Sequence, residues 1–178
     1  MKIFGKGFAY ALFGNLLSGI MVISIAPMIS IWFVCLVAFL FTLFIYASLL
    51  FTAGYRDGQR EISLIKNHRV EASPKYRWII FGLIIGAVMA IPTVVLLMSR
   101  MGMLDISQEF MFAYRFLNGA AYPMFHIAGV QSAAVADYPA WFLPVCIAFY
   151  LILTPAAAQI GYKFGYDEKT RDSFMYEK

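Results

Sequence analysis

The four longest apolar stretches of this sequence contain no Asp, Glu, Lys, Arg or His. Ionisable side chains inside a membrane span usually mark a proton relay, an ion path or a site for a charged substrate. Their absence removes the usual sequence signal of an ion-coupled transporter. The stretches run from Phe8 to Ile25, Ile29 to Ala53, Trp78 to Met98 and Tyr138 to Ile160.

Residues that support catalysis or metal binding are also scarce. The two cysteines, Cys35 and Cys146, lie inside apolar stretches, and the chain has no Cys-x-x-Cys or His-Glu-x-x-His spacing. It also lacks a Gly-rich phosphate loop and a Gly-x-Ser-x-Gly motif. His68 and His126 are expected on opposite sides of the membrane, so they cannot share a metal ion. The sequence therefore predicts a protein that is not an enzyme and has no metal or cofactor.

Apolar stretches of this length predict a membrane protein. Each is close to the roughly 20 residues that cross the hydrocarbon core as a helix, and 62% of all residues are hydrophobic. We expect one integral all-α membrane domain over residues 1–178, with four spans arranged as two hairpins. Residues 54–77 would form a cytoplasmic connection, residues 99–137 an outer segment and residues 161–178 a cytoplasmic tail.

The distribution of Lys and Arg predicts the orientation. Twelve of the 14 lie before the first span, between spans two and three, or in the tail, whereas only Arg100 and Arg115 lie on the other side. Because cytoplasmic segments retain positive charge, both termini are expected in the cytoplasm. The net charge of +4 then reflects topology and contact with anionic lipid, and nucleic acid is not an expected partner.

Two alternatives concern the number of spans. The first stretch resembles a signal peptide with a small-residue site at Ser24-Ile25-Ala26, but its apolar run is longer than that of such peptides, so we expect a retained span. Phe110 to Val130 could be counted as a fifth span, but Arg115 and His126 interrupt it. An odd number of spans would also place the basic tail outside.

We instead expect residues 110–130 to lie at the outer interface as a helix, followed by a re-entrant or protein-buried part. Asp105 together with Gln108 suggests the start of this helix, and Gly119 suggests its end. Its apolar face would hold Ile106, Phe110, Ala113 and Leu117.

The ends of spans two and four share a sequence pattern. Gly54-Tyr55-Arg56 and Gly161-Tyr162-Lys163 are each followed by a further glycine, and a Trp-Phe pair precedes each at Trp32 and Trp141. The pattern indicates a parallel internal repeat. The alternative is that aromatic and basic residues gather at membrane interfaces in any span.

Small residues at helical spacing indicate close helix contacts. Gly82, Gly86 and Ala90 form such a stripe in span three, and another in span one includes Gly7, Ala11, Asn15 and Gly19. Packing inside one four-helix bundle is the first interpretation, and a homodimer or partner interface is the alternative.

Few polar residues remain as candidates for recognition. On the outer side Glu109, Arg115 and His126 could contact a ligand or partner, and Asn15 places an amide inside span one. Interfacial salt bridges and snorkelling are the preferred explanation of the first three. On the inner side we expect Arg56 to Lys66 to continue span two as a polar helix, with ion pairs between Asp57 and Arg60 and between Arg56 and Glu61.

Two segments carry a resemblance to a known group: the stretch from Gly54 through Glu71, and Tyr114 to Asn118. In these segments the chain resembles small four-span membrane proteins of clostridial-type Gram-positive bacteria, which carry no assigned activity. The cytoplasmic segment lacks the Asp-Arg-Asn run of that group. The resemblance implies a bacterial plasma membrane and transfers no catalytic residue.

Together these patterns predict a non-catalytic multi-pass subunit or scaffold that binds lipid and either other membrane proteins or further copies of itself. The alternative is a small transporter or channel component for a neutral or weakly charged solute. A membrane-embedded cavity lined by polar groups would favour transport, whereas a packed bundle with an exposed small-residue or aromatic face would favour the subunit.

Overall fold

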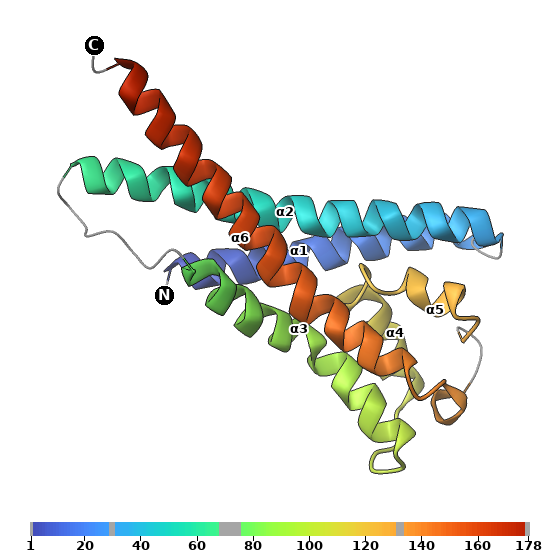
Figure 1. The fold of residues 1–178 in the computed structure, drawn as a ribbon. Helices are drawn as coiled ribbons and strands as arrows, with labels where there is room; N and C mark the ends of the chain where they lie inside the picture. The colour runs from blue at the N-terminus through green and yellow to red at the C-terminus, as the bar shows by residue number, and fades with distance from the viewer. Residues whose placement is uncertain (1, 29–30, 68–75, 131–133, 177–178) are drawn as a thin grey trace.

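The computed structural model describes residues 2–28, 31–67, 76–130 and 134–176, and the secondary structure of this part is helical throughout (Figure 1). Four helices are long: α1 (Lys2–Ser24), α2 (Trp32–Lys66), α3 (Arg77–Arg100) and α6 (Phe142–Tyr176). The short elements are η1 (Ala26–Met28), α4 (Gln108–Leu117), α5 (Pro123–Ile127) and η2 (Val135–Asp137).

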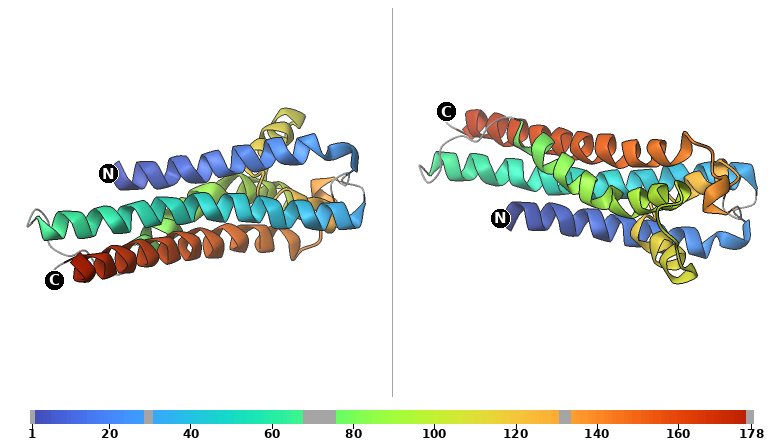
Figure 2. Two further views of the ribbon diagram at one scale, coloured as in Figure 1. Left: turned by 90° about the horizontal axis from the view of Figure 1, so that it is seen from above. Right: turned by 90° about the horizontal axis from the view of Figure 1, so that it is seen from below.

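The four long helices are each long and apolar enough to cross a membrane, which confirms the predicted all-helical class with four candidate spans. Helix α1 runs antiparallel to α2, and α6 packs against both α2 and α3 (Figures 1 and 2). The N-terminus, the end of α2, the start of α3 and the end of α6 lie at one end of the bundle, which we call the charged end (Figure 1). The other end carries α4, α5 and η2, and we call it the loop end.

Helix α2 continues well past its apolar part, as expected. Its 35 residues correspond to about 52 Å of helix, against about 30 Å of hydrocarbon. The polar part from Arg56 to Lys66 therefore extends beyond the apolar layer at the charged end. Helix α6 has the same length and extends in the same way (Figure 1).

Helices α2 and α6 cross with their backbones in direct contact at two pairs of glycines. A Cβ atom added to Gly54 would lie 2.8 Å from the Tyr162 nitrogen, and one added to Gly58 would lie 2.8 Å from the Tyr166 nitrogen. On the facing helix, a Cβ on Gly161 would lie 2.8 Å from the Phe51 Cα atom, and one on Gly165 would lie 2.8 Å from the Tyr55 carbonyl carbon. Only glycine fits at these positions, as in the Gly-x-x-x-Gly contacts of membrane helices.

The stripe predicted in span three lies against α6. A Cβ on Gly82 would lie 2.9 Å from Pro155, one on Gly86 would lie 2.6 Å from the Tyr150 oxygen, and Ala90 is buried. The stripe in α1 faces other partners, with Gly7 against Trp78 and Ile85. Both stripes thus contact neighbouring helices of the same chain.

The outer segment begins with α4, which projects from the side of the bundle (Figure 2). Its N-cap is Ser107, whose side chain accepts a hydrogen bond from the Phe110 nitrogen, so the predicted start at Asp105 was wrong. The predicted apolar face was also wrong in part. Tyr114 of α4 is buried, whereas Ala113 and Leu117 are exposed.

After α4 the chain turns into the bundle. Residues 118–121 are fully buried, and a Cβ on Gly119 would lie 2.6 Å from the Cα atom of Gly19 on α1. Gly119 therefore serves close packing, and Asn118 is the C-cap of α4. This arrangement agrees with the protein-buried alternative for the segment.

Candidate functional site

Two acidic residues of α2 meet one arginine of α3 at the charged end. The Arg77 guanidinium pairs with Asp57 and, at 3.0 Å, with Glu61. The side chain of Glu61 is only 5% exposed, so water screens this charge poorly. The predicted pairs within α2, Asp57 with Arg60 and Arg56 with Glu61, were wrong, because both acids turn toward α3.

Neighbouring helices complete this cluster. Trp78 of α3 donates an indole hydrogen bond to Asp57 at 2.9 Å, and Tyr162 of α6 donates its hydroxyl to Glu61 at 2.9 Å. The Arg77 guanidinium also lies over the Tyr162 ring, at 5.6 Å from its centroid. The ion cluster therefore links α2, α3 and α6.

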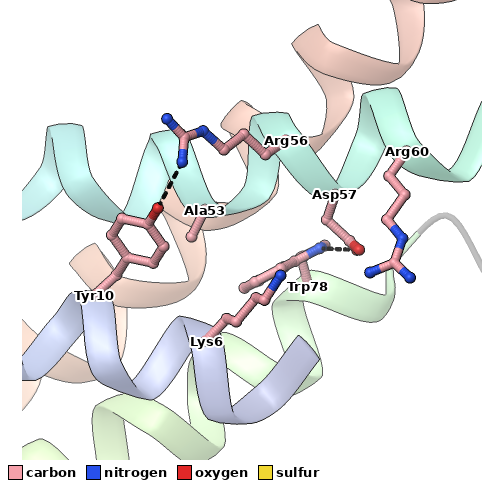
Figure 3. Close-up of a pocket in the computed structure, with 7 residues that line it drawn as sticks. All are labelled: Lys6, Tyr10, Ala53, Arg56, Asp57, Arg60 and Trp78. Carbon is pink, nitrogen blue, oxygen red and sulfur yellow. Dashed lines mark hydrogen bonds between the residues drawn. The ribbon is translucent and has the colours of Figure 1, made fainter. Parts of the chain in front are cut away.

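A pocket of about 290 Å³ lies beside the cluster (Figure 3). Three cationic side chains line it, and the Arg56 guanidinium donates a hydrogen bond to the Tyr10 hydroxyl at 3.0 Å. Among the described residues, none of these three cations forms an ion pair. The pocket is lined by Lys6, Tyr10, Ala53, Arg56, Asp57, Arg60 and Trp78.

At the loop end, Arg115 and His126 line one pocket of about 280 Å³, together with Tyr122 and residues of α1. The Arg115 guanidinium lies 5.5 Å from the Tyr122 ring centroid, and the His126 ring meets Tyr122 edge-on at 5.3 Å. Burial lowers the pKa of His126, and the positive charge of Arg115 lowers it further. His126 is thus held neutral at pH 7.

Glu109 and Arg115 line a second, wider pocket of about 550 Å³ at the same end. A hydrogen bond from the Ser107 side chain lowers the pKa of Glu109, so this carboxylate is charged at neutral pH. Arg115 lies between the two pockets and borders both. Of the predicted candidates Glu109, Arg115 and His126, Arg115 is therefore the one that lines both pockets.

Asn15 lies elsewhere, in the core of the bundle. Its side-chain oxygen accepts hydrogen bonds from the Ala120 nitrogen at 3.2 Å and from the Tyr150 hydroxyl at 2.9 Å, and its nitrogen donates to the Met89 sulfur at 3.5 Å. The residue is 0% exposed. Asn15 therefore joins α1 to the buried loop and to α3 and α6, and it does not reach the pocket of Arg115.

Asn118 is a polar residue that the sequence did not single out as a candidate. It is 0% exposed, and neither atom of its side-chain amide bonds to another described residue. An unpaired buried amide costs about 1–3 kcal/mol, so this side chain adds no stability through hydrogen bonding.

Metal and thiol chemistry finds little support in the described part of the chain. No group of three His, Cys, Asp or Glu side chains is close enough there to hold a metal ion. Cys35 and Cys146 are both buried, and the Cys35 thiol donates to the Pro123 carbonyl at 3.3 Å. His68 lies outside the described residues.

Sequence reasoning missed the charged end as a site. A signal was available, because Asp57 and Glu61 lie four residues apart on the predicted continuation of α2 and therefore share a face. Arg77 immediately precedes the apolar part of α3. If α2 and α3 lie side by side, Arg77 is at the same height along the bundle as those two acids.

Comparison with known proteins adds no family: no family model, curated protein or solved structure matches this chain. The fold thus defines the class, an all-helical protein with four candidate membrane spans.

Proposed function

We propose that this protein is a non-catalytic subunit or scaffold of a complex in the bacterial plasma membrane. The observation that carries the proposal is the closure of the bundle. Helices α2 and α6 touch backbone to backbone at Gly54 and Gly161, and α3 closes on α6 at Gly86. The pockets described above open at the two ends of the bundle.

Several polar groups of the core support the same interpretation, because they bond to one another across helices. Tyr46 bonds to Thr154 at 2.9 Å, and Thr93 bonds to Tyr114 at 3.1 Å. Membrane helices use such interhelical hydrogen bonds to fix their packing. A solute path would instead present these groups to an open cavity.

The charged end faces the cytoplasm in this proposal, and the excess of Lys and Arg near that end supports the orientation. The glycine contact also supports a parallel internal repeat. Gly54 and Gly161 occupy equivalent positions in the shared pattern. Gly54 lies against Ala158 of α6, and Gly161 lies against Phe51 of α2, which is the position equivalent to Ala158. Such an exchange is typical of a two-fold axis along the membrane normal.

The partner surface in this proposal is the projecting side of α4. Phe112 is 63% exposed there and meets Phe116 edge-on at 5.1 Å. Exposed aromatic side chains outside the spans are suited to the core of a protein interface.

Co-purification tests this proposal. The full-length protein is purified from its source membrane and kept in native-like lipid throughout. The co-purifying proteins are then identified and quantified. We expect a partner in fixed stoichiometry that is lost in the Phe112→Ala variant. Phe44→Ala is the matched control, because Phe44 is 66% exposed on α2 within a span. Absence of any stoichiometric partner, or equal loss in both variants, would contradict the proposal.

Transport is the second candidate, and one observation favours it. The outer segment dips into the bundle, which brings Arg115 and His126 beside Gly19 of α1. A polar solute or a weak anion could bind in this pocket, through the arginine charge and the neutral imidazole.

A further inference from the structure

The pocket at the charged end holds more positive than negative charge. Lys6, Arg56 and Arg60 line it, with Asp57 as the one acid among its lining residues. Asp57 is already paired with Arg77 and bonded to Trp78, and it points toward Trp78 rather than toward the lysine (Figure 3). The three lining cations therefore retain their charge for an anion from outside.

The position of this pocket along the helices indicates the kind of anion that it binds. Three helices change from polar to apolar sequence around it: the apolar stretches begin at Phe8 and Trp78 and end at Ala53. Trp78 and Tyr10 line the pocket at that boundary, where Trp and Tyr side chains usually meet lipid headgroups. Basic pockets between membrane helices at this level bind anionic headgroups.

We propose that this pocket binds the phosphate of an anionic phospholipid. Lys6 and Arg60 supply charge to the phosphate oxygens, and Arg56 adds a third cation that the Tyr10 hydroxyl holds in place at 3.0 Å. Ala53 and Trp78 are buried at the base of the pocket lining, and the half-buried Tyr10 ring would border the start of the acyl chains. The inference rests on the four-span membrane embedding and is independent of the proposed protein partner.

Native mass spectrometry of the full-length protein tests the site. The protein is released from nanodiscs that contain equal amounts of phosphatidylglycerol and phosphatidylcholine, and the retained lipids are counted. We expect preferential retention of one phosphatidylglycerol. The Lys6→Gln and Arg60→Gln variants should each lower that preference about five-fold and the double variant about thirty-fold, since one cation contributes roughly that much near anionic lipid.

Lys163→Gln is the matched control. Lys163 is exposed on α6 near the same end and is not among the lining residues, so its loss removes one charge without changing the pocket. Lys6 and Arg60 are exposed and bond to no other described residue, so the variants should retain the thermal midpoint of the wild type in phosphatidylcholine alone. That midpoint is measured for each variant.

Three outcomes would overturn the proposal. The first is equal retention of both lipids by the wild type. The second is an equal loss of preference in the Lys163 variant, which would indicate charge attraction without a site. The third is displacement of the lipid by millimolar inorganic phosphate, which would indicate a site for a free anion.

Discussion

Arg77 balances two buried acids from another helix. Its guanidinium is the ion-pair partner of both Asp57 and Glu61, whose side chains are 10% and 5% exposed. Breaking a buried ion pair by removing one partner leaves an uncompensated charge and costs about 3–5 kcal/mol. The stability of the charged end therefore depends on this residue more than on the exposed cations around it.

Replacing Arg77 by Gln should thus lower the free energy of unfolding by about 3 kcal/mol. Arg60→Gln, which removes an exposed arginine three residues after Asp57 and next to Glu61 in the sequence, should change it by less than about 0.5 kcal/mol. Thermal or denaturant unfolding in one detergent measures both. Adding Asp57→Asn and Glu61→Gln to the Arg77 variant should restore part of the loss, and equal effects of the two single arginine variants would contradict the assignment.

His126 predicts a pH dependence of stability. Its folded-state pKa lies below the ordinary value of 6.5, because burial and Arg115 disfavour the charged imidazole. Between the folded-state pKa and 6.5 the unfolded chain binds more protons, so stability falls as the pH decreases through this window. Above 6.5 this contribution is constant.

Unfolding midpoints of the wild type and of His126→Gln between pH 5 and pH 8 test this sign. The wild type should lose stability below about pH 6.5 relative to the variant, and the two curves should run parallel above it. A wild type that gains stability on acidification relative to the variant would show that His126 is stabilised in its charged form.

At the scale of elements, the crossing of α2 and α6 depends on the absence of side chains. Alanine favours helices over glycine by up to about 1 kcal/mol, so Gly→Ala stabilises a helix where space allows. At Gly54 and Gly161 the added Cβ would meet the backbone of the facing helix, and the two helices would have to separate. Sterics and propensity therefore act in opposite directions at this contact.

We expect Gly54→Ala and Gly161→Ala each to lower the free energy of unfolding by about 2 kcal/mol or more, as substitutions that overpack a core do. The unfolding midpoint of each variant should fall accordingly. Gly5→Ala is the control, because a Cβ at Gly5 of α1 would meet no atom of another helix within 4 Å. That variant should be neutral or slightly stabilised. A stabilised Gly54 variant would mean that the two helices are not in backbone contact.

Some features of the helices could be predicted from the sequence, and others could not. The length and apolar character of the spans, and the continuation of α2 beyond Arg56, follow from local composition and were predictable. The partner of Asp57 was missed because only pairs within α2 were considered, although Asp57 and Glu61 share a face and Arg77 begins the next span. The glycines at 54 and 161 were noticed as a repeat, yet their role as a contact depends on which helices pack together.

The same limit applies to the candidate sites. Arg115 and His126 were singled out because they interrupt an apolar segment, and the structure places both in one pocket. Asn15 was grouped with them by its polarity alone, but its side chain bonds inside the bundle to Tyr150, to Met89 and to the buried turn at Ala120. The Asn118-Gly119 pair marks a turn locally, but nothing in the local pattern indicates that this turn packs against α1.

At the scale of the whole molecule, the proposed orientation predicts accessibility. Single cysteines at Asn67 and Ser173 should be shielded from a membrane-impermeant thiol reagent in intact cells, while one at Glu109 should react. The native Cys35 and Cys146 are buried, which keeps the background low. Labelling of Ser173 from outside would require an odd number of spans and would contradict the four-span arrangement.

The central claim is that this closed bundle acts through association and moves no solute by itself. Flux measurement in proteoliposomes tests it most directly, with purified full-length protein as the only protein and a panel of neutral and weakly acidic solutes. We predict no saturable flux above protein-free vesicles. Saturable flux that is lost in Arg115→Gln or His126→Gln, and retained in Lys163→Gln, would contradict the claim. It would establish the pocket lined by Arg115 and His126 as a transport site.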